Sequence, residues 1–396
     1  MSYDAALDAL QRQWRAAVVL YALGLAGLGL FLRVHLSLAH TLLWLGLSGV
    51  IGFYILSYLY IRLPENIRPG ELEPTPSLGP GSALSLLGGW FLAVMGGFLV
   101  LPRPEGAWAW LPALAFLAAL VADLFDGWLA RRSGVVTRLG ADLDMTLDGL
   151  GVLLASALAV RWGQWPFWFI IVGLARYLFL WGLAWRRRHG LPTRALEDSV
   201  TRRLLAGMQR GFLFVALWPI MPAWLATATG LAFVLPFLVN FTYDWLVASA
   251  VIDDRDPDFR KALRRWQALA YGPVALAVRL AAALAAAMTL WQAYGDQHAF
   301  AAGLARAAGL GSGAAWGLLA AGAVLTLLLL AGVIPRLAAA LLYAPISFIL
   351  ASGVGFWPGL LAVYGLTGVI LLGGGPLVWW QPEDAFFTKR LGSSES

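Results

Sequence analysis

The chain has 396 residues, of which 60% are hydrophobic and 13% are charged, with a formal net charge of +6 and no cysteine. Soluble domains are closer to half apolar and about a quarter charged, so this composition excludes a water-soluble globule. It also excludes a disordered chain, because disorder requires low hydrophobicity and high charge. The lack of cysteine excludes a disulfide scaffold and a thiolate metal site. In a membrane chain, loop arginines on the cytoplasmic side explain the positive charge, so we expect no nucleic-acid partner.

Long apolar stretches follow one another from the first residues to the last. Each is 17 to 25 residues long, the length of helix that crosses about 30 Å of hydrocarbon. Lone strands cannot satisfy their backbone groups in lipid, so the sequence predicts an all-α polytopic membrane protein. We expect spans at 14–33, 40–61, 81–101, 109–131, 141–160, 165–185, 207–225, 226–250, 269–293, 313–334, 337–353 and 356–377.

The distribution of basic residues predicts the orientation of these spans. If the N-terminus is cytoplasmic and the spans alternate, most of the 28 Lys+Arg fall in cytoplasmic segments. Positive residues favour that side, so both termini are expected inside the cell, with the protein in the cytoplasmic membrane. Polar content divides the chain into five parts. They are a two-helix segment (1–62), a cytoplasmic linker (63–80), a charged six-span domain (81–250), a basic linker (251–268) and a four-helix domain with a tail (269–396).

Four aspartates lie in two adjacent predicted spans. Asp123 and Asp126 are three residues apart and therefore share one face of a helix, while Asp144 and Asp148, four apart, share a face of the next. A short loop joins the two helices, so they must be antiparallel neighbours. The four carboxylates can therefore converge near the cytoplasmic end of a hairpin. Two small residues on the face of Asp123 and Asp126 leave room for a ligand: Gly127 and Ala130.

Such a cluster is costly in a membrane. One aspartate at mid-span costs roughly 2.5–3.5 kcal/mol on insertion scales, and clustered carboxylates repel unless cations or protons separate them. Oxygen ligands without histidine or cysteine suit Mg²⁺, Mn²⁺ or Ca²⁺, and two such ions can assist displacement at phosphorus. Two alternatives are helix-end acids paired with Arg131, Arg132 and Arg138, and a proton- or sodium-coupled transporter.

The residues from Asp123 to Asp148 follow the pattern D-x-x-D-G-x-x-A-R-x8-G-x-x-x-D-x-x-x-D at every fixed position. This pattern resembles the signature of the CDP-alcohol phosphotransferase (CDP-alcohol phosphatidyltransferase) family, and the likeness covers about 81–250. The resemblance implies a six-helix membrane enzyme, usually a homodimer. Such an enzyme transfers a substituted phosphoryl group from a CDP-linked donor to an alcohol and releases CMP.

The resemblance also implies roles for the aspartates. Asp123, Asp126 and Asp144 would hold two divalent cations, Mg²⁺ or Mn²⁺, beside the donor diphosphate. Asp148 would take the proton of the acceptor hydroxyl as a general base and would also touch a metal.

Donor binding is expected from small and polar residues of the same domain. Gly127, Ala130 and Gly140 would let the nucleotide approach, and Arg131 would meet donor phosphate. Ser82 and Ser85 of the preceding span could hydrogen-bond cytidine or ribose. One departure stands in that span, because Gly88 occupies the position where the family often has arginine.

Several arginines near the later spans are candidates for binding the acceptor. A buried arginine needs a partner or a polar cavity, so Arg176 either binds acceptor or donor phosphate or pairs with a neighbouring helix. The other candidates for a phosphorylated acceptor are Arg202, Arg203 and Arg210. Plain cytoplasmic charge is the alternative for Arg202 and Arg203.

The last four spans have a different character, rich in alanine, leucine and glycine. Residues 269–390 resemble small four-helix DoxX-like membrane proteins through the placement of glycine and arginine; an accessory bundle that packs or oligomerises is the alternative. The sequence as a whole predicts a lipid-synthesis enzyme that transfers a phosphatidyl group from CDP-diacylglycerol to a small polar or phosphorylated alcohol. The competing hypothesis is a non-catalytic membrane scaffold or ion-coupled transporter with a relict metal site.

Overall fold

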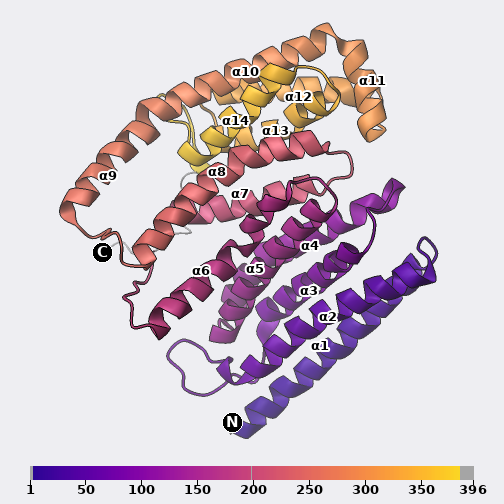
Figure 1. Ribbon diagram of the computed structural model, residues 1–396, viewed down its shortest axis with the longest axis vertical. Coiled ribbons are helices and arrows are strands. Elements are labelled where there is room, and N and C mark those ends of the chain that lie inside the picture. The colour runs from indigo at the N-terminus through magenta and orange to yellow at the C-terminus, as the bar shows by residue number, and fades with distance from the viewer. Residues whose placement is uncertain (1–2, 198, 384–396) are drawn as a thin grey trace. The chain divides into compact units, whose positions relative to one another are not determined.

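The computed structural model describes residues 3–197 and 199–383. Their secondary structure is helical apart from two isolated bridges, Ile67 to Pro74 and Val333 to Trp380. Figure 1 shows the helices α1 to α14 along the chain. The predicted all-α fold is therefore confirmed for the described residues.

The chain divides into two compact units. The first contains residues 1–177 and 210–219, and the second contains 178–209 and 220–396. Two helices contribute to both units, because the boundaries after residues 177 and 209 fall inside helices. The five-part division expected from the sequence stays a prediction.

The first unit is a helical bundle centred on α3. Its helices are α1 (Tyr3–Leu32), α2 (Leu38–Arg62), α3 (Gly79–Gly96), α4 (Leu111–Ser133), α5 (Arg138–Arg161), the beginning of α6 (Ile170–Arg188) and the end of α7 (Val200–Ala216). Helix α3 packs against α4, α5 and α2. In lipid, helices associate through close packing of small residues, and α3 supplies them: a Cβ on Gly81 would lie 2.7 Å from that of Ala130, and one on Gly88 3.3 Å from that of Ala122.

The linker between α2 and α3 is tied to the bundle by hydrogen bonds. Asn66 is fully buried and donates to the carbonyls of Thr75, at 2.7 Å, and Ser77, at 2.9 Å. The backbone NH of Arg138, the first residue of α5, donates to the carbonyl of Ile67 at 2.9 Å. The linker therefore fixes the beginnings of α3 and α5 next to each other.

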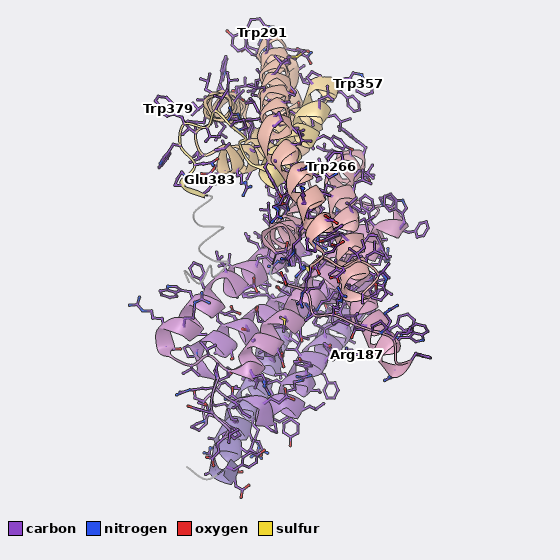
Figure 2. All side chains as sticks on the ribbon, turned by 90° about the vertical axis from the view of Figure 1, so that its left-hand side faces the viewer. Arg187, Trp266, Trp291, Trp357, Trp379 and Glu383 are labelled. Atoms are coloured by element: carbon purple, nitrogen blue, oxygen red, sulfur yellow. The ribbon has the colours of Figure 1, made fainter. Side chains whose placement is uncertain are left out.

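The second unit holds the remaining helices. They are the rest of α6 and α7, α8 (Ala223–Ala248), α9 (Pro257–Leu269), a π-helical turn (Ala270–Val274), α10 (Ala275–Gly295), α11 (Gln297–Ala308), α12 (Ser312–Ala331), α13 (Pro335–Ala351) and α14 (Phe356–Leu372). Helix α10 packs against α14, where Gly365 allows close approach to Ala282. Exposed tryptophans project from this unit, as an interfacial belt would: Trp266, Trp291 and Trp357 (Figure 2).

Among the described residues, nine helices are long and apolar enough to cross a membrane. The predicted spans at 207–225, 337–353 and 356–377 correspond to shorter apolar helices. Helix α7 ends at Ala216 and α8 begins at Ala223, because Pro219 and Pro222 interrupt the apolar run. Helix α11 lies where the sequence predicted a loop. The chain is a multi-pass membrane protein, and the orientation of its termini stays a prediction.

Candidate active site

The turn between α4 and α5 sets the positions of the aspartates. Helix α4 ends at Gly134, whose φ of +68° is left-handed and favours glycine. Helix α5 begins after Thr137, whose hydroxyl accepts a hydrogen bond from the Gly140 NH at 3.1 Å, a typical N-cap. Both signals are local, so the predicted hairpin forms, with a connection of 134–137 that is shorter than the expected 132–140.

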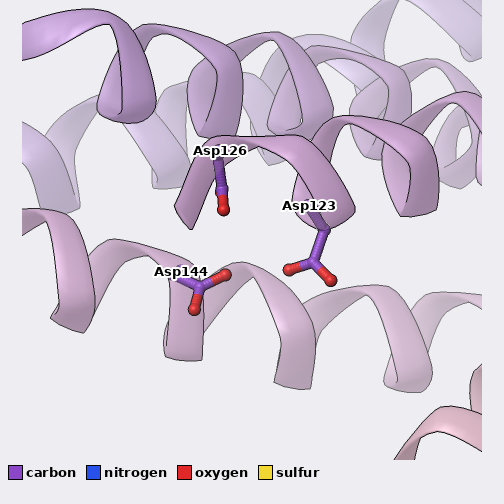
Figure 3. A group of neighbouring side chains, drawn as sticks. All are labelled: Asp123, Asp126 and Asp144. Atoms are coloured by element: carbon purple, nitrogen blue, oxygen red, sulfur yellow. The ribbon is translucent and has the colours of Figure 1, made fainter. Parts of the chain in front are cut away.

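Three carboxylates face one another across this hairpin. Asp123 and Asp126 project from α4 toward Asp144 of α5 (Figure 3). Each offers one oxygen, and these oxygens lie within 4.8 Å of one another. Asp126 is buried, and the other two are half-buried. The spacing-based prediction that these side chains converge is therefore met by the geometry.

Asp148 joins the cluster through an arginine. Arg210 of α7 donates from Nη1 to Oδ2 of Asp123 at 2.8 Å and also to Oδ1 of Asp148. The same guanidinium thus forms salt bridges with carboxylates from α4 and α5. The sequence had offered Arg210 as an acceptor-binding residue and had not paired it with these acids.

The two serines of α3 are buried and face the hairpin. Ser85 donates from Oγ to Oδ2 of Asp126 at 2.6 Å, which fixes the orientation of that carboxylate. Ser82 lies against α5, since a Cβ on Gly140 would be 3.1 Å from the Ser82 Oγ. Ser85 therefore orients an acid of the cluster, and the nucleotide contact expected of Ser82 and Ser85 stays a prediction.

Two small residues of the pattern lie against neighbouring protein groups, Ala130 on another helix and Gly127 on its own. Ala130 packs against Gly81 of α3, and an added Cβ on Gly127 would lie 3.2 Å from Nη1 of Arg131. The guanidinium of Arg131 thus lies over Gly127, and Arg131 is exposed. Close packing by Gly81 and Ala130 brings α3 near enough for Ser85 to reach Asp126.

A pocket of about 370 Å³ opens beside the carboxylates. All four aspartates and Arg210 line it, together with the apolar side chains of Leu92, Phe116, Leu120 and Leu147. One wall of the pocket is therefore acidic and the other apolar. An apolar wall excludes water and strengthens the electrostatic interactions of the charged wall.

The remaining candidate arginines lie in different surroundings. Arg176 of α6 lies against α5, because a Cβ on Gly149 would be 2.7 Å from its Cδ. In the second unit, Arg202 forms a bidentate pair with Asp244 through Nε at 2.9 Å and Nη2 at 3.0 Å. Asp244, which the sequence did not pair with Arg202, is one of the few buried acids. The side chain of Arg203 lies outside the described residues.

The donor set suits a hard divalent cation. The cluster of three offers only carboxylate oxygens, without histidine or cysteine among the described residues, and such ligands are those of Mg²⁺, Mn²⁺ or Ca²⁺. Asp123 and Asp148 share the charge of Arg210, while Ser85 gives Asp126 only a neutral hydrogen bond. More positive charge is needed to balance four carboxylates in a partly buried pocket.

The fold and this pocket together define a polytopic membrane protein with an acidic pocket whose carboxylates could hold a metal ion. Residues 82–251 match the family model described as CDP-alcohol phosphatidyltransferase, which confirms the resemblance drawn from the aspartate pattern. The family comprises transferases of phosphate-containing groups, so the chain carries a transferase domain. No curated protein and no solved structure matched the chain. The match ends at Val251, so the DoxX-like resemblance of the last block stays a prediction.

Proposed function

We propose that the chain transfers a phosphatidyl group from CDP-diacylglycerol to an alcohol and releases CMP, in phospholipid biosynthesis. The observation that carries the proposal is the convergence of three carboxylates within 4.8 Å, with Asp148 on the same pocket wall. The family match supports the reaction class. In the reaction, the acceptor oxygen bonds to the phosphorus that bears diacylglycerol, and the bond from that phosphorus to the CMP oxygen breaks.

Asp123, Asp126 and Asp144 would hold two Mg²⁺ or Mn²⁺ ions beside the donor diphosphate. When bound, these ions neutralise phosphate charge and make CMP a better leaving group. The protein's own contribution is to hold the three carboxylates in place. Ser85 does this for Asp126, and Arg210 does it for Asp123.

Asp148 would accept the proton of the acceptor hydroxyl. Its side chain is 34% exposed and lines the pocket, so a substrate hydroxyl can reach it. Arg210 holds one of its oxygens, Oδ1, and so orients the carboxylate within the pocket. A carboxylate held in this way is suited to general-base catalysis.

Arg176 is the best placed of the candidate arginines to meet a phosphorylated acceptor. It lies against Gly149, the residue directly after Asp148. The guanidinium of Arg202 is engaged by Asp244, and that of Arg210 by two acids of the pocket. Arg131 is exposed at the end of α4 and would meet donor phosphate, with Gly127 and Gly140 beside the nucleotide.

The decisive experiment measures CMP release by the purified protein in lipid nanodiscs, with Mg²⁺ or Mn²⁺ and a panel of CDP-linked donors and alcohols. We expect release with CDP-diacylglycerol, loss of release with EDTA, and no release by Asp148→Asn. Asp142→Asn is the matched control. Asp142 also lies on α5, but it does not line the pocket and forms a salt bridge of 2.8 Å with Arg62. Metal binding without CMP release for any donor and acceptor would contradict the proposal and favour a non-catalytic scaffold.

The family resemblance further implies a homodimer, and the arginine distribution implies a cytoplasmic mouth for the pocket. Mass measurement of the detergent-solubilised protein tests the first. Accessibility of cysteines introduced at the chain termini and in loops tests the second, and the natural absence of cysteine gives a clean background. We expect the termini to be labelled only after the cytoplasmic side is opened.

A further inference from the structure

A second hollow lies in the first unit, between α1 and α3, and the proposed function does not use it. It has a volume of about 1260 Å³. Helix α1 lies outside the family match, which begins at Ser82. The hollow, called the α1–α3 groove below, is therefore built by the N-terminal helix together with the first helix of the transferase domain. Its walls are mainly apolar: Ala16, Ala17, Leu20, Ala83, Leu86 and Leu87.

Three hydrogen bonds join the two sides of the groove. Two of them lie at its beginning, and the third lies at its floor. At the beginning, the side chain of Gln13 donates to the carbonyl of Pro76 at 2.8 Å and accepts from the NH of Leu78 at 3.1 Å. The floor forms where the Tyr21 hydroxyl donates to the carbonyl of Leu86. These contacts hold α1 and α3 side by side and parallel, with the groove open along their outer face.

The far end of the groove is closed by Trp90. Its ring lies against α1, since a Cβ on Gly24 would be 2.9 Å from the Trp90 Nε1. From Gly79 to Trp90 the groove follows about 16 Å of helix at 1.5 Å per residue. This is roughly half of the 30 Å hydrocarbon thickness. The groove therefore has the depth of one leaflet.

The open side of the groove is apolar and faces outward from spanning helices. Leu20 is 68% exposed and Leu87 is 47% exposed, and both lie in helices that qualify as membrane spans. A groove in this position is filled by hydrocarbon, because the bilayer is its solvent. Arg12 lies one helical turn before Ala16 and is exposed, so a cation stands near the beginning of the groove.

The beginning of the groove is next to the candidate active site. A Cβ on Gly79 would lie 2.7 Å from Cγ1 of Val135, in the turn between α4 and α5. Two residues further along α3, Gly81 packs against Ala130, which belongs to the aspartate pattern. Helix α3 thus presents Ser85 to Asp126 on one face and Ala83 and Leu87 to the groove on another.

We propose that the α1–α3 groove binds an acyl chain of the CDP-linked lipid donor, an inference that rests on the proposed function. The chain enters past Leu78 and Gly79 and runs toward Trp90. The diphosphate then lies between the beginning of α3 and the carboxylates of α4 and α5. The N-terminal helix thereby becomes part of the donor site and selects donors with long acyl chains.

The first test fills the groove. Ala16→Trp places a large ring in the groove, and Ala22→Trp is the matched control, because Ala22 is exposed on the same helix and does not line the groove. For a dioleoyl donor we expect Ala16→Trp to raise the KM by roughly tenfold or more. The KM for a CDP-linked donor with very short acyl chains should stay unchanged in both variants. Equal KM values for the long-chain donor in the two variants would overturn the proposal.

The second test does not depend on turnover. A CDP-diacylglycerol analogue with a photoreactive group near the end of one acyl chain is cross-linked to the wild-type protein in nanodiscs, and the labelled peptides are identified by mass spectrometry. We expect labelling within 13–24 and 83–90, with competition by unlabelled CDP-diacylglycerol and much less by phosphatidylcholine. Equal competition by both lipids would show a general membrane-lipid site and overturn the proposal. Specific labelling without CMP release would instead contradict the proposed transfer reaction and leave the donor site standing.

Discussion

Arg210 on α7 forms one hydrogen-bonded bridge between Asp148 on α5 and Asp123 on α4. The bridge places a cation between acids of two neighbouring helices, and the Arg210 side chain is 22% exposed. It neutralises part of the negative charge that the four aspartates gather. The arrangement links α7 mechanically to the hairpin that carries the candidate metal ligands.

The first prediction concerns this bridge. Arg210→Gln removes the cation, and we expect the metal-free protein to lose about 1–3 kcal/mol of stability, less than a fully buried pair because the groups are part-exposed. Mn²⁺ should then raise the unfolding temperature of the variant by more than it raises that of the wild type. Thermal unfolding with and without Mn²⁺ measures both effects. Arg62→Gln, which removes a salt bridge outside the pocket, should show no added response to metal.

The second prediction is that divalent cations stabilise the folded protein through the three clustered carboxylates. At about 100 times its dissociation constant, a bound ion adds about 2.7 kcal/mol to the free energy of unfolding. Asp144→Asn should lose most of this gain, while Asp142→Asn should keep it, because Asp142 does not line the pocket. The measurement is thermal unfolding across a Mg²⁺ and Mn²⁺ titration with a Na⁺ control. An unchanged response in Asp144→Asn would rule out the assigned ligand set.

The third prediction concerns the orientation of Asp126. Ser85→Ala leaves the buried carboxylate without its 2.6 Å hydrogen bond, which costs about 1–3 kcal/mol. We expect weaker Mn²⁺ binding together with lower stability. Ser82→Ala, one turn earlier on α3, is the control, because Ser82 does not donate to Asp126 in the described structure. Titration of Mn²⁺ by paramagnetic resonance should separate the two variants; equal affinities would show that the bond is unimportant for the metal.

Much of the site follows from local sequence rules. The spacing of Asp123, Asp126 and Asp144 fixes their helix faces, and the Gly134 and Thr137 signals fix the turn between the helices. Residues this close in sequence are positioned by helix periodicity alone. The sequence could therefore predict both the hairpin and the convergence of its acids.

The longer-range pairs could not be predicted in the same way. Arg210 reaches acids that lie 62 and 87 residues away in the chain, and Arg202 reaches Asp244 across 42 residues. These contacts depend on where a helix packs, which hydropathy does not specify. The early end of α7 had a visible signal in Pro219 and Pro222, but the apolar residues around them extended the predicted span.

The fourth prediction concerns pH and an ion pair outside the membrane spans. Arg194 donates to both oxygens of Asp253, at 2.6 and 3.2 Å, and this hydrogen bond holds the pKa of Asp253 below its ordinary value of 3.8. A lowered carboxyl pKa adds stability above the unfolded pKa, and that stability is lost as the pH falls through the folded pKa. The loop 191–197 should therefore exchange amide hydrogens faster in Asp253→Asn than in wild type at pH 7. The difference should shrink as the pH falls below 3.8 and vanish below the folded pKa of Asp253; a difference that persists there would contradict the assigned cause.

The fifth prediction tests whether the approach of α3 to α4 positions the carboxylates. A Cβ on Gly81 would lie 2.7 Å from that of Ala130 and 2.8 Å from the carbonyl oxygen of Asp126, so a valine at this position must push α4 away. Overpacking of this kind costs about 1–3 kcal/mol, and the displaced Asp126 should also lose its bond to Ser85. We expect Gly81→Val to lower both the unfolding temperature and the Mn²⁺ affinity. Gly27→Val on α1 is the control, since nothing lies within 4 Å of an added Cβ there. If Gly81→Val lowered stability but left the Mn²⁺ affinity unchanged, the packing of α3 would serve the fold alone and the carboxylates would owe their positions to the hairpin.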